Sequence, residues 1–194
     1  HEHLEYYSLK SLKYLLDKAG LKIINLSFNQ INGGSIEVDV VKNKSQLKEC
    51  KHLISWVLKS ERLNKYNEIE KHKQFFKECQ NHKVLLKELL ITLKKQNKKI
   101  LGYGASTKGN VLLQYCNIDS KLLDYISEVN KFKFNKYTPG SNIKIISEKE
   151  AKSKKPDYML VLPWHFKDHI LKREQNFLKN GGKLIFPLPD IEIV

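Results

Sequence analysis

Short apolar segments alternate with helical patterns from Lys98 to the end of this 194-residue chain. The strand patterns occupy residues 98–104, 121–129, 142–147, 157–163 and 182–189, and the helical patterns occupy 107–116, 148–154 and 166–179. Strands such as the one from Met159 to Leu162 are apolar without interruption, which is typical of a parallel sheet covered by helices on both faces. Residues 98–194 are therefore predicted to form an α/β domain around a parallel sheet.

A glycine-rich turn joins the first strand of this domain to its first helix, in the sequence ILGYGASTKGN at 100–110. Gly102 and Gly104 permit a sharp turn and a close approach to a ligand, and the following helix offers amides and a positive dipole end to an anion. Lys108 adds a positive charge. The pattern indicates phosphate binding, but residue 107 is Thr, so neither G-x-G-x-x-G nor a P-loop is complete. A tight turn with a solvated lysine remains the alternative.

Three loops follow predicted strands on one edge of the sheet: GYGASTKG, EVNKFKFNKYTPG and PWHF. In open parallel sheets, ligands bind beyond the carboxyl ends of the strands. We therefore expect the three loops to converge on one crevice.

The N-terminal part, residues 1–42, reads as helix, strand, turn and strand. Residues 6–19 place leucines on one helical face, and Gly20 follows as a C-cap. Two strand patterns then flank the turn signal Asn-Gly-Gly at 32–34. Because two strands alone are marginally stable, this part is expected to complete a sheet whose other strands lie outside the sequence.

Residues 43–97 are charged and helical and are predicted to form a linker region. The segment 59–83 has few apolar residues, which indicates a solvated helix or one that faces a partner. His52, His72 and His82 are interpreted as surface residues, since no His-x-x-x-His or His/Cys cluster has metal-ligand spacing. No metal site is predicted in this chain.

The composition further limits the class of protein and its expected compartment. The apolar fraction of 41% supports a globular core, and neither an 18-residue apolar run nor a signal-peptide pattern is present, so no membrane partner is expected. The cysteines, Cys50, Cys79 and Cys116, are odd in number and form no C-x-x-C, which favours the cytoplasm. The chain begins at His1 without methionine, and we expect it to be a piece of a longer protein. Nothing in the sequence predicts the oligomeric state.

The formal net charge is +14, but only Arg62 and Arg173 are arginines. Recognition of base edges and bidentate binding of phosphate favour arginine over lysine. A nucleic-acid partner is therefore not the favoured interpretation, and a noncatalytic domain that binds polyanions remains an alternative.

The motifs above carry a family resemblance. GYGASTKGN, SEVNKFKFNKYTPGSNI, YMLVLPWHFKDHI and NGGKLIFPLPDIEIV resemble, in this order, the C-terminal domain of sugar C-methyltransferases that act on nucleotide-linked sugars. Residues 1–38 resemble the end of the S-adenosylmethionine (SAM) domain that precedes it in that family. The resemblance implies three parts: 1–42, a remnant of the SAM domain; 43–97, a helical linker; and 98–194, a Rossmann-like C-terminal domain.

The resemblance also implies an activity, SAM-dependent C-methylation of a nucleotide-linked 4-keto deoxysugar. Its partner would be a nucleotide-diphosphate sugar held by this chain. SAM would be bound by an upstream domain, and zinc by a domain further toward the N-terminus. Since the sequence lacks the donor-binding motif, we expect this chain alone to transfer no methyl group.

The catalytic candidates come from the element H-E-H-x-x-Y. By resemblance, Glu2 and His3 do acid/base work on the sugar. Methylation next to a keto group requires removal of an acidic C–H proton, for which a histidine with a pKa near neutrality is suited. Without the resemblance, the element reads as a chain end with no role.

The substrate-binding candidates lie in the three loops. The first loop matches the family and implies contacts to the nucleotide diphosphate from Gly102, Gly104, Ser106, Thr107 and Lys108. The second keeps Asn130, Lys133 and Tyr137 but lacks the family's arginines. The third keeps Trp164, which would stack on a base or sugar or pack in the core. His165 stands where the family has asparagine, as a replacement hydrogen-bond donor.

A dinucleotide-binding module of NAD(P) type is the remaining alternative. Glu128 lies at the end of the second strand, about 20 residues after the glycine turn, where such modules carry an acidic residue for the ribose. The complete dinucleotide fingerprint is missing, however, and this interpretation leaves the second and third loops unexplained.

Overall fold

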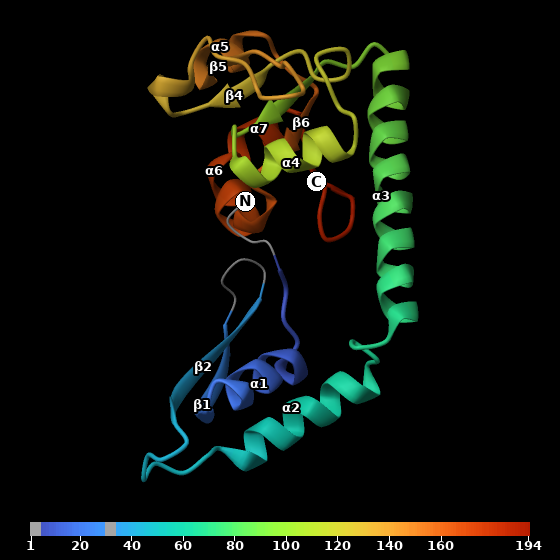
Figure 1. Cartoon of the computed structure of the whole chain (residues 1–194). Helices are drawn as coiled ribbons and strands as arrows, with labels where there is room; N and C mark the ends of the chain where they lie inside the picture. Colours follow the sequence, from blue (N-terminus) through green and yellow to red (C-terminus); the bar gives the residue numbers. More distant parts are fainter. Residues whose placement is uncertain (1–4, 30–33) are drawn as a thin grey trace. The chain divides into compact units, whose positions relative to one another are not determined.

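The structure, a computed structural model, describes residues 5–29 and 34–194. The chain divides into two compact units, His1–Lys77 and Glu78–Val194. Figure 1 labels most of the helices and strands of the two units, which are described in turn below.

The first unit is a helix packed on a β-hairpin and closed by a second helix. Its elements are α1 (Leu9–Lys18), β1 (Leu21–Asn29), β2 (Ser35–Lys42) and α2 (Lys51–Leu63). β1 and β2 pair antiparallel in a two-stranded sheet. Leu9, Ile23, Leu26, Ile54 and Val57 are buried between the hairpin and the helices. The predicted helix and both strands are confirmed, while part of the predicted turn lies outside the described residues.

Polar contacts fix the beginning of α1. The Ser8 hydroxyl caps the helix by accepting a hydrogen bond from the Ser11 amide at 3.2 Å. The buried Glu61 of α2 accepts hydrogen bonds from the amides of Leu9 and Lys10. A carboxylate at a helix N-terminus is stabilising because it meets unpaired amides and the positive dipole end.

The helix α3 (Ile69–Lys95) has 27 residues. In its C-terminal part, Leu86, Leu90 and Leu93 are buried in the core of the second unit. In its N-terminal part, Phe75 and Phe76 are exposed, which agrees with the predicted solvated or partner-facing helix. The proposed limits of the linker, residues 43 and 97, remain a prediction.

The second unit is a mostly parallel six-stranded sheet with strand order β5-β4-β3-β6-β7-β8. The strands are β3 (Ile100–Tyr103), β4 (Ile126–Glu128), β5 (Ile145–Ser147), β6 (Tyr158–Val161), β7 (Lys183–Phe186) and β8 (Glu192–Ile193). β3 to β7 pair in parallel, and β8 pairs antiparallel with β7. The predicted Rossmann-like α/β fold is confirmed, and the short edge strand β8 was not predicted.

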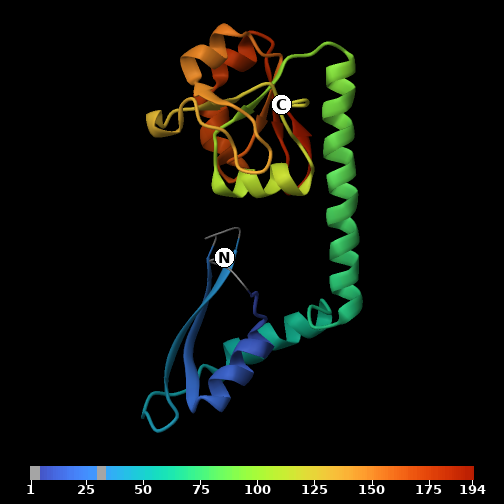
Figure 2. The ribbon, with the colours of Figure 1, turned by 45° about the horizontal axis from the view of Figure 1, so that its top comes forward.

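Helices cover both faces of this sheet. They are α4 (Thr107–Tyr115), α5 (Glu148–Ser153), α6 (Lys167–Arg173) and α7 (Gln175–Lys179). α3 and α4 share one core with alternate strand residues such as Ile100 and Leu160. On the other face, α6 and α7 pack on Met159 and Val161. Figure 2 shows α4, in yellow-green, apart from the orange and red helices.

The helix predicted over 166–179 is divided in two. α6 ends at Arg173 and α7 begins at Gln175. Glu174 between them has φ −98° and ψ 20°, and its side chain is buried. A hydrogen bond from Tyr103 holds this carboxylate, so a tertiary contact overrides the helical pattern. Among the described residues, no helix combines the length and the apolar character needed to cross a membrane.

Candidate functional site

The strand order creates a crevice beside β3. β4 and β5 follow β3 in sequence and lie on one side of it in the sheet, whereas β6 and β7 lie on its other side. Such a switch point is where open α/β sheets bind ligands. A cavity of about 300 Å³ opens there. Its lining includes Gly104 and Ser106 from the first loop, Glu128 and Lys133 from the second, and Pro163 from the third. The expected convergence of the three loops is confirmed.

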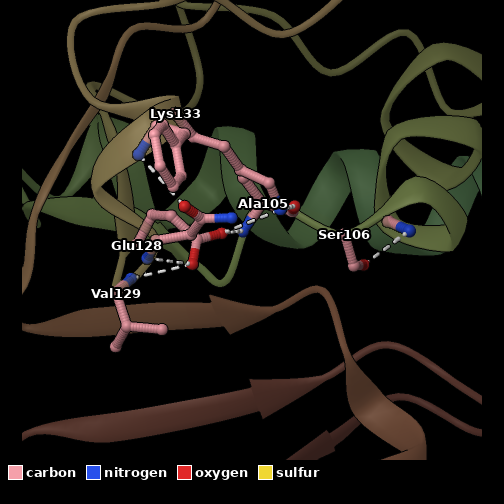
Figure 3. A network of polar contacts seen from close by, with 8 residues as sticks. Ala105, Ser106, Glu128, Val129 and Lys133 are labelled. Atoms are coloured by element: carbon pink, nitrogen blue, oxygen red, sulfur yellow. Dashed lines mark hydrogen bonds and ion pairs between the residues drawn. The ribbon is translucent and has the colours of Figure 1, made fainter.

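Glu128 is the polar centre of this junction (Figure 3). Its Oε1 accepts hydrogen bonds from the amides of Val129 and Asn130, at 2.8 and 2.9 Å. Its Oε2 accepts one from the amide of Ala105 at 2.9 Å and lies 3.4 Å from the ammonium group of Lys133. This ammonium also donates to the Ala105 carbonyl at 2.8 Å. Glu128 thus ties the first loop to the second.

The environment keeps Glu128 ionised. Burial by itself would raise the pKa of this carboxyl, but the amides of Asn130, Val129 and Ala105 and the charge of Lys133 together lower the pKa below its ordinary value. A carboxylate has about four acceptor positions, and four donors surround this one. The ribose contact of a dinucleotide-binding module is therefore disfavoured, because Glu128 is committed to the protein itself.

The glycines of the first loop serve the turn and its packing. Gly104 has φ +77°, a backbone conformation that favours glycine. A Cβ at Gly102 would lie 2.8 Å from the side chain of Ile126, and one at Gly109 would lie 2.4 Å from Leu162. Gly109 was not predicted, and it allows α4 to approach Leu162, the residue that follows β6.

Most amides of this loop have partners within the protein. The Gly104 amide donates to the Ser127 carbonyl at 2.8 Å, and the Ser106 amide donates to the Gly104 carbonyl at 3.0 Å. The Ser106 hydroxyl caps α4 by accepting from the Gly109 amide at 3.0 Å. An anion at this loop would thus meet chiefly the exposed first turn of α4, which begins with Thr107 and Lys108.

Arg173 enters the cavity from α6 and is held by two carboxylates. Its Nη2 forms an ion pair with Glu148, and its Nε lies 3.6 Å from Oε1 of Glu174. The same Oε1 accepts the hydrogen bond of the Tyr103 hydroxyl at 3.0 Å. Tyr103 and Arg173 both line the cavity. Burial and the neighbouring charge of Glu174 raise the pKa of Tyr103, so its hydroxyl stays a donor at neutral pH.

The remaining candidates of the second loop lie outside the cavity lining. The Asn130 side chain accepts a hydrogen bond from the Phe132 amide at 3.0 Å and caps the short 3-10 helix Lys131–Lys133. Tyr137 is exposed, and its backbone pairs with Lys144. In the structure the Asn130 side chain thus stabilises the turn that begins the 3-10 helix.

In the third loop, Trp164 is half-buried and packs against the cores on both faces of the sheet. His165 is exposed and lies between two aromatic rings, with ring centroids 5.9 Å from Trp164 and 4.2 Å from Phe166. Partial desolvation of the imidazole and the positive charge of Lys108 lower the pKa of His165. The third loop and the beginning of α4 are therefore electrostatic neighbours.

Of the predicted binding residues, Gly104, Ser106 and Lys133 line the cavity. The other predicted residues that the structure describes lie outside the lining. Gly102 is in β3, Thr107 and Lys108 begin α4, and the rest are in the second and third loops: Asn130, Tyr137, Trp164 and His165. Glu2 and His3 lie outside the described residues. Tyr103 and Arg173 were missed, although the rarity of arginine in this chain was a usable signal for Arg173.

The first unit has a cavity of its own, of about 540 Å³. Aromatic side chains dominate its lining, among them Tyr6, Tyr7, Phe28, Trp56 and Phe75. Phe28 and Trp56 meet edge to face with ring centroids 6.3 Å apart. Tyr6 belongs to the H-E-H-x-x-Y element, so this cavity begins where the predicted catalytic element ends.

Metal coordination finds no support in residues 5–29 and 34–194. No group of three or more His, Cys, Asp or Glu side chains in these ranges could hold an ion. The cysteines Cys50, Cys79 and Cys116 are free thiols.

Comparison with known proteins gives consistent matches. Residues 30–189 match the family described as the C-methyltransferase C-terminal domain. Over all 194 residues, the chain is 31% identical to the C-methyltransferase NovU of Streptomyces niveus and covers 46% of that protein. The chain thus spans about half the length of this curated relative.

Proposed function

The chain belongs to the C-methyltransferase family, and on this premise we propose that it forms the nucleotide-sugar-binding part of a SAM-dependent C-methyltransferase. The proposed acceptor is a nucleotide-linked 4-keto deoxysugar. The observation that carries the proposal is the cavity at the switch point beside β3, where all three loops that resemble the family meet.

The diphosphate of this substrate is assigned to the first turn of α4. Thr107 and Lys108 are exposed at a helix N-terminus, where amides and the dipole favour an anion. Lys133, fixed by the Ala105 carbonyl and Glu128, adds a second positive charge nearby. Thr107 and both lysines belonged to the predicted set of binding residues.

The chemistry of the acceptor explains the catalytic candidates. A carbon next to a keto group becomes nucleophilic when it loses a proton. His3 would remove this proton and Glu2 would orient the imidazole. SAM, when bound, supplies the electrophilic methyl group.

The second unit does not fit SAM itself. Its glycine-rich turn leads to Glu128, and this carboxylate is already surrounded by the amides of Ala105, Val129 and Asn130 and by Lys133. An adenosyl ribose would have to displace these donors. We therefore propose that this unit does not hold SAM and that the 194-residue chain alone transfers no methyl group. Zinc stays a prediction from the family resemblance.

The division into 1–42, 43–97 and 98–194 and a location in the cytoplasm belong to the same proposal. The free thiols of Cys50, Cys79 and Cys116 are compatible with a reducing compartment. A dinucleotide module and a polyanion-binding domain are the competing functions, and the following experiment separates them.

The test is calorimetric titration of the chain with a thymidine-diphosphate sugar, NADH and SAM. The proposal predicts binding of the sugar nucleotide alone, weakened in Lys108→Ala. Lys179→Ala, which removes an exposed lysine on α7, is the matched control and should bind like the wild type. Binding of NADH alone would support the dinucleotide function. Strong binding of single-stranded nucleic acid that falls steeply with salt would support the polyanion function.

A further inference from the structure

We propose that a further cavity of the second unit, the α5–α7 cavity, binds a small organic anion with an apolar body, such as an aromatic carboxylate. Residues of α5 and α7, the last residue of α6 and the segments that precede β6 and β7 form its lining. Its volume of about 590 Å³ is in the usual range of small-molecule sites. Neither the family resemblance nor the proposed function assigns a ligand to it.

The α5–α7 cavity lies at the other end of the strands from the candidate site. Pro156 precedes β6 and Gly182 precedes β7, so these two lining residues mark the amino ends of a parallel pair. The cavity beside β3 is built from loops that follow strands, at their carboxyl ends. Arg173 belongs to both linings. A ligand of the α5–α7 cavity therefore has a site of its own.

The inner part of the α5–α7 cavity is apolar. Met159 is 2% exposed, and Pro156 is buried beside it in the lining. The half-buried ring of Phe177 lies against the backbone of Gly182, where an added Cβ would be 2.2 Å from Cε2 of the ring. A thioether and an aromatic ring are surfaces to which another aromatic ring binds favourably. The apolar body of the proposed ligand is assigned to this part.

The charged groups of the lining favour an anion. The lining contains three cations, Lys152, Lys155 and Arg173, and one carboxylate, Glu174, which leaves an excess of two positive charges. Glu148, outside the lining, pairs with Arg173, and counting it still leaves an excess of one. A positive surplus around a cavity with apolar walls attracts anions and repels cations.

The carboxylate of Glu174 is engaged with cations of the same lining. Glu174 is 3% exposed, and its Oε2 lies 3.9 Å from Nζ of Lys152 while its Oε1 lies 3.6 Å from Nε of Arg173. The Tyr103 hydroxyl also donates to Oε1. These partners offset the negative charge of Glu174, so that it does not prevent an anion from binding.

Donors for the anionic group remain in the lining. Within residues 5–29 and 34–194, no hydrogen bond or ion pair is found for the side chains of Lys155, Asn176 and Asn180. All three are exposed, and an ammonium and two amide groups together offer several N–H donors to a carboxylate. The proposed ligand thus combines an anionic group at these residues with an apolar body on Met159 and Phe177.

The test uses Met159 as a reporter, since it is the single methionine of the chain. Labelling with methionine that carries ¹³C in its methyl group gives one side-chain NMR signal, from a residue of this lining. Titration of the 194-residue chain with 2-naphthoate should shift this signal, because a nearby aromatic ring changes the local magnetic field. A dissociation constant on the order of 1 mM is expected for a ligand of this size.

Two further probes separate charge from apolar contact. The amide 2-naphthamide has the same rings without the charge and should bind about tenfold more weakly than 2-naphthoate. Inorganic phosphate has the charge without the rings and should leave the Met159 signal in place at the same concentrations.

Variants of the two lysines test the anionic part of the site. Lys155→Ala should weaken 2-naphthoate roughly threefold, and Lys152→Ala combined with Lys155→Ala about tenfold, as for exposed ion pairs. Neither change should affect 2-naphthamide. Lys172→Ala combined with Lys179→Ala removes the same charge from exposed positions of α6 and α7 outside the lining and should bind like wild type. Circular dichroism reports whether each variant is folded.

The inference is overturned if 2-naphthoate at about 10 mM does not move the Met159 signal of the wild type, or if 2-naphthamide binds as tightly. It is also overturned if phosphate alone shifts the signal, or if the lysine variants and their control weaken 2-naphthoate equally. Lys152 and Lys155 do not line the cavity beside β3, so none of these results bears on the binding of a sugar nucleotide there. Failure of the proposed function likewise leaves the α5–α7 site standing.

Discussion

The hydroxyl of Tyr103 donates a hydrogen bond to the carboxylate of Glu174 at 3.0 Å, between the end of β3 and the break that separates α6 from α7. Both side chains are buried. The contact joins the strand that precedes the glycine turn to the helix that carries Arg173. It therefore sets the position of the guanidinium in the cavity as well as the packing on this face of the sheet.

Replacing Tyr103 with phenylalanine should lower the free energy of unfolding. The variant removes a buried donor and leaves Oε1 of Glu174 with the guanidinium of Arg173 at 3.6 Å. A cost of about 1–3 kcal/mol is expected for a buried acceptor that loses its partner. Urea denaturation measures it. Tyr125→Phe is the control, since no hydrogen bond of the Tyr125 hydroxyl is found within the described residues, and equal losses in the two variants would contradict the role of Tyr103.

Glu128→Gln should destabilise the second unit in a pH-dependent way. The glutamine side chain has an NH2 group in place of one carboxylate oxygen, and at neutral pH this group faces other donors, such as the Ala105 amide or Lys133. We therefore expect the free energy of unfolding to fall by about 1–3 kcal/mol. Because the pKa of Glu128 is lowered in the fold, its contribution is complete above the ordinary carboxyl pKa and is lost as the pH falls toward the folded pKa.

The difference between wild type and Glu128→Gln should therefore shrink between about pH 7 and about pH 3.5. Urea denaturation at both pH values measures it. Glu88→Gln, at an exposed carboxylate on α3, serves as the control and should change stability little at either pH. If the difference in free energy of unfolding between wild type and Glu128→Gln did not change with pH, the negative charge of Glu128 would not be the source of its stabilising effect.

Most elements of the fold could be predicted from the sequence because they depend on local residue patterns. The apolar run at Met159 predicted a buried parallel strand, and the glycine turn predicted the passage from β3 to α4. The break between α6 and α7 at Glu174 could not be predicted from local sequence, since Glu174 is held by Tyr103, 71 positions away. The edge strand β8 was missed because Glu192–Ile193 has only two residues, too few to show a period.

The candidate site could be predicted only in part, because some of its contacts join residues that are distant in sequence. The sequence predicted the three loops at one edge of the sheet, and Gly104, Ser106 and Lys133 of the predicted binding residues line the cavity there. It could not show that Glu128 is saturated by three amides, because backbone partners leave no pattern of side chains. Nor could it place Arg173 there, since α6 reaches the cavity only through the folding of the helices over the sheet.

Gly109→Ala should destabilise the packing of α4 on the sheet. The added Cβ would lie 2.4 Å from Cβ of Leu162, so α4 or the segment that follows β6 must shift. Overpacking of this kind costs about 1–3 kcal/mol, against roughly 1 kcal/mol gained from helix propensity. Thermal unfolding should show a lower midpoint. Val111→Ala, on the exposed side of the same helix, should have a much smaller effect, and a Gly109→Ala variant as stable as wild type would show that α4 can move freely.

Lys108→Ala should raise the pKa of His165. Burial is the larger cause of the lowered pKa and remains in the variant, whereas the repulsion by the Lys108 ammonium is removed. The pKa is thus expected to move up and still stay below the ordinary histidine value. Titration of the imidazole Cε1 protons by NMR measures this shift, and His165→Asn assigns the signal. An unchanged pKa of His165 would mean that the Lys108 ammonium lies too far from the third loop to repel the protonated imidazole.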